Sequence, residues 1–65
     1  GSEGVVGEDF KYIRYMKEPD KFIYEELFDR RDDILETDNL AGDTEYQELK
    51  QEMTEKTEKY KRTLK

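Results

Sequence analysis

The stretch "KYIRYMKEPDKFIYEELF", residues 11–28, decides how this chain folds, because it holds half of the Ile, Leu, Met, Phe and Tyr side chains. Six of the eight Phe and Tyr residues lie between Phe10 and Phe28. The chain as a whole is very polar: 46% of the 65 residues are charged and 32% are hydrophobic. A chain this short buries only about 60% of its unfolded surface, so these rings serve either as a thin core or as a surface for a partner.

The first half of the stretch predicts a short helix over residues 9–17. On a helical wheel three apolar residues form one stripe and two tyrosines flank it: Phe10, Ile13, Met16, Tyr12 and Tyr15. A strand fits less well, because the adjacent Tyr12 and Ile13 would then point to opposite faces.

A second helix is predicted over residues 19–36, "PDKFIYEELFDRRDDILE". Pro19 restrains Glu18 away from the helical region and fits the first turn of the helix that follows. Most of its apolar residues share one broad arc that should face the core: Ile23, Tyr24, Leu27, Phe28, Ile34 and Leu35. Phe22 points to the opposite side of this helix.

Residues 37–43, "TDNLAGD", read as a turn, with Asp43 or Thr44 as the N-cap of a third helix. That helix should run to about Arg62. Three Glu–Lys or Glu–Arg pairs at i,i+4 support it, and its apolar stripe is narrow, as in a helix with one neighbour: Tyr46, Leu49, Met53 and Tyr60.

These patterns predict an all-α fold, a small helical bundle made of an antiparallel helical hairpin plus a short N-terminal helix. Residues 1–8 are expected to be a flexible segment, with Gly1–Ser2 as a cloning remnant. Residues 9–64 are expected to form a single small helical domain.

The composition argues against catalysis and metal binding. The chain has no His and no Cys, the side chains most often used as bases, nucleophiles and soft metal ligands. Residues 37–48 have the length of a calcium-binding EF-hand loop, but Thr37 and Ala41 occupy positions that need other oxygen ligands. The sequence therefore predicts no enzyme, no catalytic residue, no metal and no cofactor.

The net charge of −6 comes entirely from residues 1–42, where twelve Asp and Glu face six Lys and Arg. An acidic surface repels nucleic acid and anionic lipid, so neither nucleic acid nor membrane is expected as a partner. It suits a protein with a basic surface. The lack of Cys favours an intracellular location, cytoplasm or nucleus.

The leading functional hypothesis is a non-catalytic, regulatory protein–protein interaction module, an aromatic patch rimmed by acidic residues. The expected partner-binding residues are Tyr12, Tyr15, Phe22, Glu18, Asp20, Glu25 and Asp29. Packing at the rim of the bundle is the alternative for Tyr12 and Tyr15, and packing onto Met16 or Pro19 is the alternative for Phe22.

Two further hypotheses remain open. A structural or scaffold role would come from coiled-coil self-assembly, a homodimer through the stripe Tyr46, Leu49, Met53 and Tyr60. An acidic inhibitor that imitates nucleic acid would use the charge of residues 1–42 to occupy a basic protein cleft.

Overall fold

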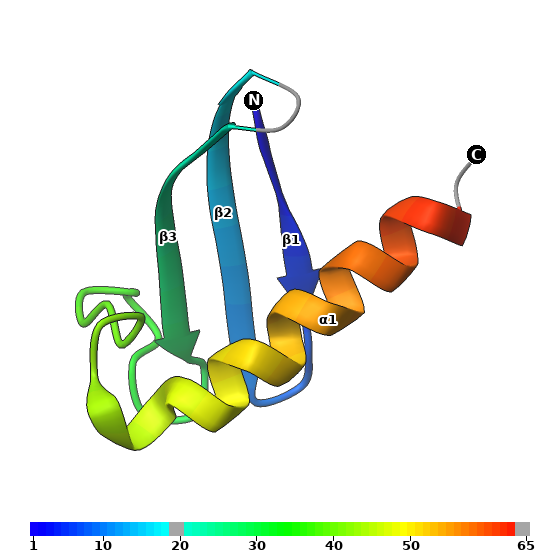
Figure 1. The fold of residues 1–65 in the computed structure, drawn as a ribbon. Helices are drawn as coiled ribbons and strands as arrows, with labels where there is room; N and C mark the ends of the chain where they lie inside the picture. The colour runs from blue at the N-terminus through cyan, green and yellow to red at the C-terminus, as the bar shows by residue number, and fades with distance from the viewer. Residues whose placement is uncertain (19–20, 64–65) are drawn as a thin grey trace.

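The structure, a computed structural model, describes residues 1–18 and 21–63. Its first half is an antiparallel sheet of three strands in the order β1 (Ser2–Val6), β2 (Phe10–Glu18) and β3 (Lys21–Asp29). Consecutive strands are neighbours, so the sheet is a simple meander (Figure 1).

One helix covers a face of this sheet within the described residues. The 3-10 turn η1 (Thr44–Tyr46) leads directly into α1 (Gln47–Thr63), which crosses the sheet obliquely in Figure 1. The predicted third helix is therefore confirmed to within a few residues. Asp43 is its N-cap, since the Asp43 carboxylate accepts a hydrogen bond from the backbone N–H of Glu45.

The prediction of an all-α bundle was wrong. Residues 9–17 and 19–36, expected as two helices, instead supply β2 and β3, and residues 30–43 form the connection to η1. Aromatic and β-branched side chains favour strands, and pairing β2 with β3 satisfies the backbone of both. The adjacent Tyr12 and Ile13 do point to opposite faces, as alternation along a strand requires. The strand accommodates both because each face of the sheet carries apolar side chains.

The core lies between the sheet and α1. Tyr12 and Leu27 face each other across β2 and β3 and are 1% and 0% exposed, and Ala41 and Met53 are buried against them. Five partly buried residues surround this cluster: Val5, Phe10, Leu40, Tyr46 and Leu49. Three residues of the stripe predicted to form a dimer, Tyr46, Leu49 and Met53, therefore pack in or against the core of the same chain. Tyr60, the fourth, is exposed.

The predicted inward arc of the second helix was only partly right. Leu27 and Phe28 are buried, but Tyr24 is exposed and Ile34 and Leu35 are each 83% exposed. The arc assumed helical spacing, whereas alternation along β3 sends Leu27 and Phe28 to opposite faces.

Residues 2–6, assigned from the sequence to a flexible segment, form the edge strand β1. Gly4 lies opposite Ile13, where a Cβ atom would run into the backbone carbonyl of Tyr12. The lack of a side chain at Gly4 therefore allows β1 to approach β2 closely.

Candidate functional site

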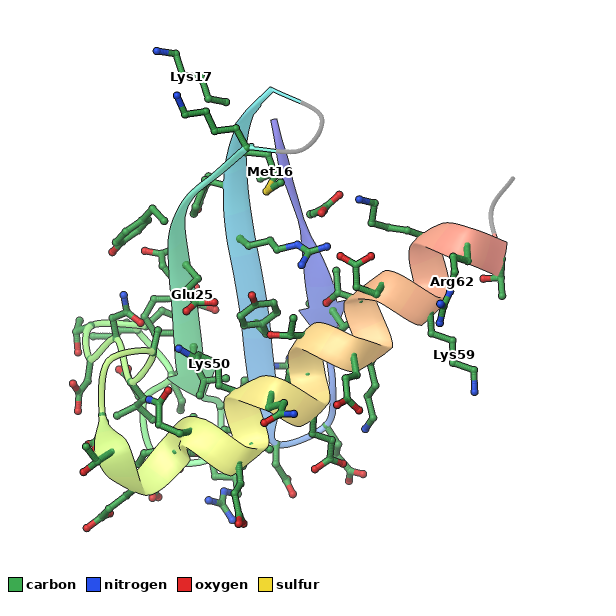
Figure 2. The ribbon with its side chains drawn as sticks, in the orientation of Figure 1. Met16, Lys17, Glu25, Lys50, Lys59 and Arg62 are labelled. Carbon is green, nitrogen blue, oxygen red and sulfur yellow. The ribbon has the colours of Figure 1, made fainter. Side chains whose placement is uncertain are left out.

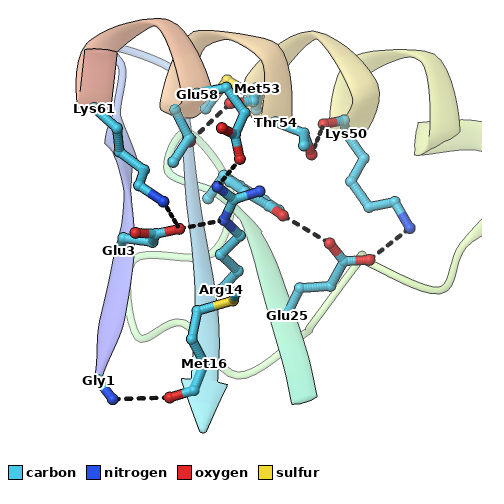
Figure 3. A network of polar contacts seen from close by, with 12 residues as sticks. Gly1, Glu3, Arg14, Met16, Glu25, Lys50, Met53, Thr54, Glu58 and Lys61 are labelled. Carbon is cyan, nitrogen blue, oxygen red and sulfur yellow. Dashed lines mark hydrogen bonds and ion pairs between the residues drawn. The ribbon is translucent and has the colours of Figure 1, made fainter. Parts of the chain in front are cut away.

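A buried arginine joins three elements on the helix-covered face. Arg14 of β2 donates from Nε to Glu3 Oε1 of β1 at 2.7 Å and from its terminal nitrogen to Glu58 of α1. Lys61 of α1 donates to the same Glu3 oxygen at 3.1 Å. Figure 3 shows the guanidinium between the two carboxylates, so this network fastens α1 to the sheet.

The network holds its carboxylates in the charged form. Burial raises the pKa of Glu3, but the hydrogen bonds from Lys61 and Arg14 outweigh it, so the pKa lies below the ordinary value. The hydrogen bond from Arg14 lowers the pKa of Glu58 as well. Both groups are therefore anions at neutral pH, matched to the fixed charge of Arg14.

A second polar group links β2, β3 and α1. The hydroxyl of Tyr12 donates to Glu25 Oε2 at 2.8 Å, and Lys50 Nζ donates to Glu25 Oε1 at 2.7 Å. Figure 2 shows the side chains of Glu25 and Lys50 pointing toward each other from β3 and α1. Burial raises the pKa of Tyr12, which stays a protonated donor.

The connection after β3 is fixed to the sheet by side chains. Asn39 Oδ1 accepts from the backbone N–H groups of Leu27 and Ala41, both at 3.0 Å. Asp29 Oδ1 and Oδ2 each accept a hydrogen bond from the guanidinium of Arg31 at 3.0 Å, which lowers the pKa of Asp29. The same Arg31 lies 4.9 Å from the centre of the Phe10 ring.

α1 covers one face of the sheet, and no other helix or strand of the described residues covers the opposite face. Alternation places five apolar residues on this open sheet face, of which only Phe28 is buried: Val6, Ile13, Tyr15, Tyr24 and Phe28. Tyr15 and Tyr24 are directly opposite each other, with ring centres 5.8 Å apart and planes tilted by 31°. They are 36% and 49% exposed.

The predicted partner-binding residues whose side chains the structure describes do not form one patch. Tyr12 is buried in the core, Glu25 is held by Tyr12 and Lys50, and Asp29 is buried against Arg31, so these three stabilise the fold. Tyr15 is exposed, as predicted, but on the face opposite to Tyr12. Asp20 and the side chains of Glu18 and Phe22 lie outside the described residues.

An acidic hollow beside the connection is lined by Asp29, Asp32, Asp33, Thr37, Asp38, Leu40 and Tyr46. The backbone N–H groups of Thr37 and Asp38 donate hydrogen bonds to the Asp33 carboxylate and lower its pKa.

Across residues 1–18 and 21–63, no group of three or more His, Cys, Asp or Glu residues could hold a metal ion. The helix in that part of the chain is too short and too polar to cross a membrane.

The architecture defines the class of this protein: a small α/β unit in which a three-stranded antiparallel sheet packs on one C-terminal helix. Residues 2–63 match the family model described as N-sulphoglucosamine sulphohydrolase, C-terminal, so the chain belongs to this family. No curated protein matches the chain.

This membership corrects the functional predictions. The family is the C-terminal domain of an enzyme of the sulfatase class, so the expectations of a non-catalytic interaction module and of no enzyme were wrong. The absence of His and Cys bears only on reactive groups within these 65 residues. A short chain can also be one part of a larger catalyst.

The sequence did contain a signal for the hairpin. Pro19–Asp20 separates two runs rich in Tyr, Phe and Ile, and Pro followed by Asp between two such runs is typical of a turn between strands. The buried arginine had no comparable signal, because its carboxylate partners Glu3 and Glu58 lie 11 and 44 residues away in the chain.

Proposed function

We propose that this chain serves as the C-terminal domain of a sulfohydrolase that acts on N-sulphoglucosamine. The family match over residues 2–63 carries the proposal, since it takes in the whole sheet and α1. In this reaction water adds to the sulfur and the bond between sulfur and nitrogen breaks. The water supplies the fourth oxygen of sulfate and two protons to the amino group of the sugar.

In this proposal the domain supports the enzyme through its fold, and the hydrolytic groups belong to another part of the enzyme. The arrangement of the carboxylates favours this division, because Glu3, Glu25, Asp29 and Glu58 are each held by Arg or Lys. A general acid needs a raised pKa, whereas the pKa values of Glu3, Asp29 and Glu58 are lowered.

The test uses the polypeptide that joins residues 1–65 to the hydrolytic part of the enzyme. We expect it to release inorganic sulfate from N-sulphoglucosamine, measured by ion chromatography, with N-acetylglucosamine 6-sulfate as the control substrate. A folded polypeptide that leaves N-sulphoglucosamine intact contradicts the proposed function.

A variant then tests the division of roles. Arg14→Met removes the central cation of the Glu3–Glu58 network. We expect it to lower the temperature at which the enzyme loses activity while kcat measured well below that temperature stays unchanged. A fall in kcat with unchanged thermal stability would place Arg14 in the chemistry and contradict the supporting role.

A further inference from the structure

The two halves of α1 are held to the sheet by different forces. Leu49 and Met53, in the first half, pack in or against the apolar core. Thr57 is the last buried residue of the helix, and its hydroxyl donates to the backbone carbonyl of Met53 at 2.9 Å. Beyond it, residues 58–63 contain one large apolar side chain, Tyr60, which is 57% exposed. This end segment of α1 therefore has no apolar anchor in the core.

Two ion pairs take the place of that anchor. Arg14 donates to Glu58, and Lys61 Nζ donates to Glu3 Oε1 at 3.1 Å. Figure 3 shows both pairs between the last turns of α1 and the sheet. The side chains of Glu58 and Lys61 are 50% and 41% exposed, so water and dissolved ions reach the α1 side of both pairs. Ion pairs of this kind are weakened by salt and by the loss of either charge.

The space between β1 and the end segment is not filled by side chains. A hollow of about 410 Å³ is lined by Gly4, Val5 and Val6 of β1 and by Tyr60 of α1. Atoms that line a hollow lack contacts on that side and gain no dispersion energy there. Packing at this end of α1 therefore adds little to the ion pairs, and the end segment depends on charge.

The charges of the network are balanced two against two. Arg14 of β2 and Lys61 of α1 face Glu3 of β1 and Glu58 of α1. Glu25 of β3 lies opposite Arg14 in the strand register, but its oxygens already accept hydrogen bonds from a tyrosine hydroxyl and a lysine. Protonation of either glutamate of the network thus leaves the two cations in excess, and these repel each other.

We propose that residues 58–63 are a charge-controlled flap. The flap is helical and packed on β1 while the Arg14 network is complete, and it unwinds on its own when the network is screened or protonated. Helix ends can open locally at a lower free energy than the whole fold, because few buried contacts are lost. Opening uncovers Arg14 and Val5 and leaves the rest of the core in place. The flap needs no substrate and no second domain, so its test stands apart from the proposed function.

Hydrogen exchange followed by NMR of the 65-residue chain measures the flap directly, because it reports the opening around each amide. Each rate is divided by the rate of an unstructured peptide at the same pH. Near neutral pH, the amides of the flap and those of residues 51–57 should both be protected. Flap amides that exchange as fast as the unstructured peptide would mean that the network does not hold the end segment, which overturns the proposal.

A variant that removes one charge tests the cause. Glu58→Gln keeps the size of the side chain and should lower the protection of the flap by about fivefold, the difference between a charged and a neutral hydrogen bond. Residues 51–57 should be unchanged. The matched control is Glu52→Gln, which removes the exposed pair to Lys56 and should change the flap by less than about twofold. Equal losses over residues 51–63 mean that α1 opens as a whole, and no loss means that Glu58 does not hold the flap; either result contradicts the proposal.

The same substitution in an Arg14→Met background separates the network from pairing within the helix. Glu58 also lies four residues before Arg62, an oppositely charged neighbour on α1. If the contact with Arg14 holds the flap, Glu58→Gln should change its protection by less than about twofold once Arg14 is absent. A loss as large as in the unmodified background would assign the effect to Arg62 and contradict the attachment of the flap to the sheet.

Acid and salt should open the flap without any substitution. The pKa values of Glu3 and Glu58 lie below the ordinary 4.5, so both are charged at neutral pH and gain protons only as the pH falls below that value. From about pH 6 to about pH 3, the protection of the flap should fall before that of β2 and β3. Raising the salt concentration from about 0.05 M to about 1 M near neutral pH should act in the same direction, since it shortens the range of charge interactions. Flap amides that only follow those of β2 and β3 at every step would overturn the proposal.

Discussion

Arg14 is the residue on which the packing of helix against sheet most depends. It lies at the centre of β2, is buried, and contacts carboxylates from β1 and α1. Its charge is fully matched, and no buried side-chain nitrogen or oxygen atom within the described residues lacks a hydrogen-bond partner. Removing Arg14 therefore takes the ion-pair partner from Glu58 and leaves Glu3 with Lys61 alone.

Arg14→Met should lower the free energy of unfolding by about 2 kcal/mol, because hydrogen bonds to charged groups contribute more than neutral ones. Urea unfolding of the 65-residue chain measures it. The control is Lys56→Met, which removes the exposed pair to Glu52 and should cost less than about 0.5 kcal/mol. Equal losses in the two variants would show that the Arg14 network adds nothing beyond a surface pair.

Acid should destabilise the fold through the same residues. The pKa values of Glu3, Glu58, Asp29 and Asp33 are lowered in the folded chain from ordinary values of 4.5 for Glu and 3.8 for Asp. The unfolded chain then binds more protons in this range, so stability is present above the ordinary values and is lost as pH falls through the folded ones.

Urea midpoints measured from about pH 6 to about pH 3 follow this loss. The Arg14→Met variant should show a shallower acid dependence, because the pKa of Glu58 moves back toward its ordinary value and that of Glu3 loses the part that Arg14 contributes. An acid dependence unchanged by the substitution would contradict the assigned cause.

At the scale of elements, one predicted helix was confirmed and two were wrong. The difference is whether the residue pattern excludes a strand. The region of α1 has a narrow apolar stripe and i,i+4 charge pairs, which only a helix uses. The stretch from Phe10 to Phe28 has apolar side chains on adjacent positions. These fit a wide helical arc, and they fit equally well a sheet with one covered face and one open apolar face.

Gly4 tests the closeness of β1 and β2. Gly4→Ala should destabilise the chain by about 1–3 kcal/mol, because the new methyl group meets the carbonyl of Tyr12 and the strands must separate. Thermal unfolding followed by circular dichroism measures it. Gly42→Ala is the matched control, since nothing lies within 4 Å of its Cβ position. A tolerated Gly4→Ala would contradict the pairing of β1 with β2.

Asn39 tests how the connection is held to β3. Asn39→Ala leaves the buried N–H of Leu27 without its acceptor and should cost about 1–3 kcal/mol. Asn39→Asp keeps an acceptor oxygen at the same place and should recover most of this stability. Hydrogen exchange of the Leu27 amide is the sharper measurement, because it should accelerate only in the alanine variant. Unchanged exchange in the alanine variant would show that the Leu27 N–H does not depend on Asn39 for its hydrogen bond.

At the scale of the whole molecule, features that depend on neighbouring residues could be predicted from the sequence. Features that depend on contacts between distant residues could not. The Asp43 cap and α1 follow from residues close in sequence. The contact of Arg14 with Glu58 and the packing of Tyr12 against Met53 join residues 40 or more positions apart, and one sequence gives no measure of such pairings. The enzyme family follows from the match over residues 2–63, and the composition of these residues does not indicate it.

The fold depends on the hairpin of β2 and β3, so the pairing register of these two strands is its most direct test. The outer edge of β3 bonds Asn39 and Leu40 at Leu27, so Leu27 and Tyr12 form a pair without hydrogen bonds to each other, with Cα atoms about 4.5 Å apart. NMR of the 65-residue chain should give strong Hα–Hα contacts between Tyr12 and Leu27 and between Arg14 and Glu25. Sequential amide–amide contacts through residues 10–18 and 21–29, as in helices, would contradict the account.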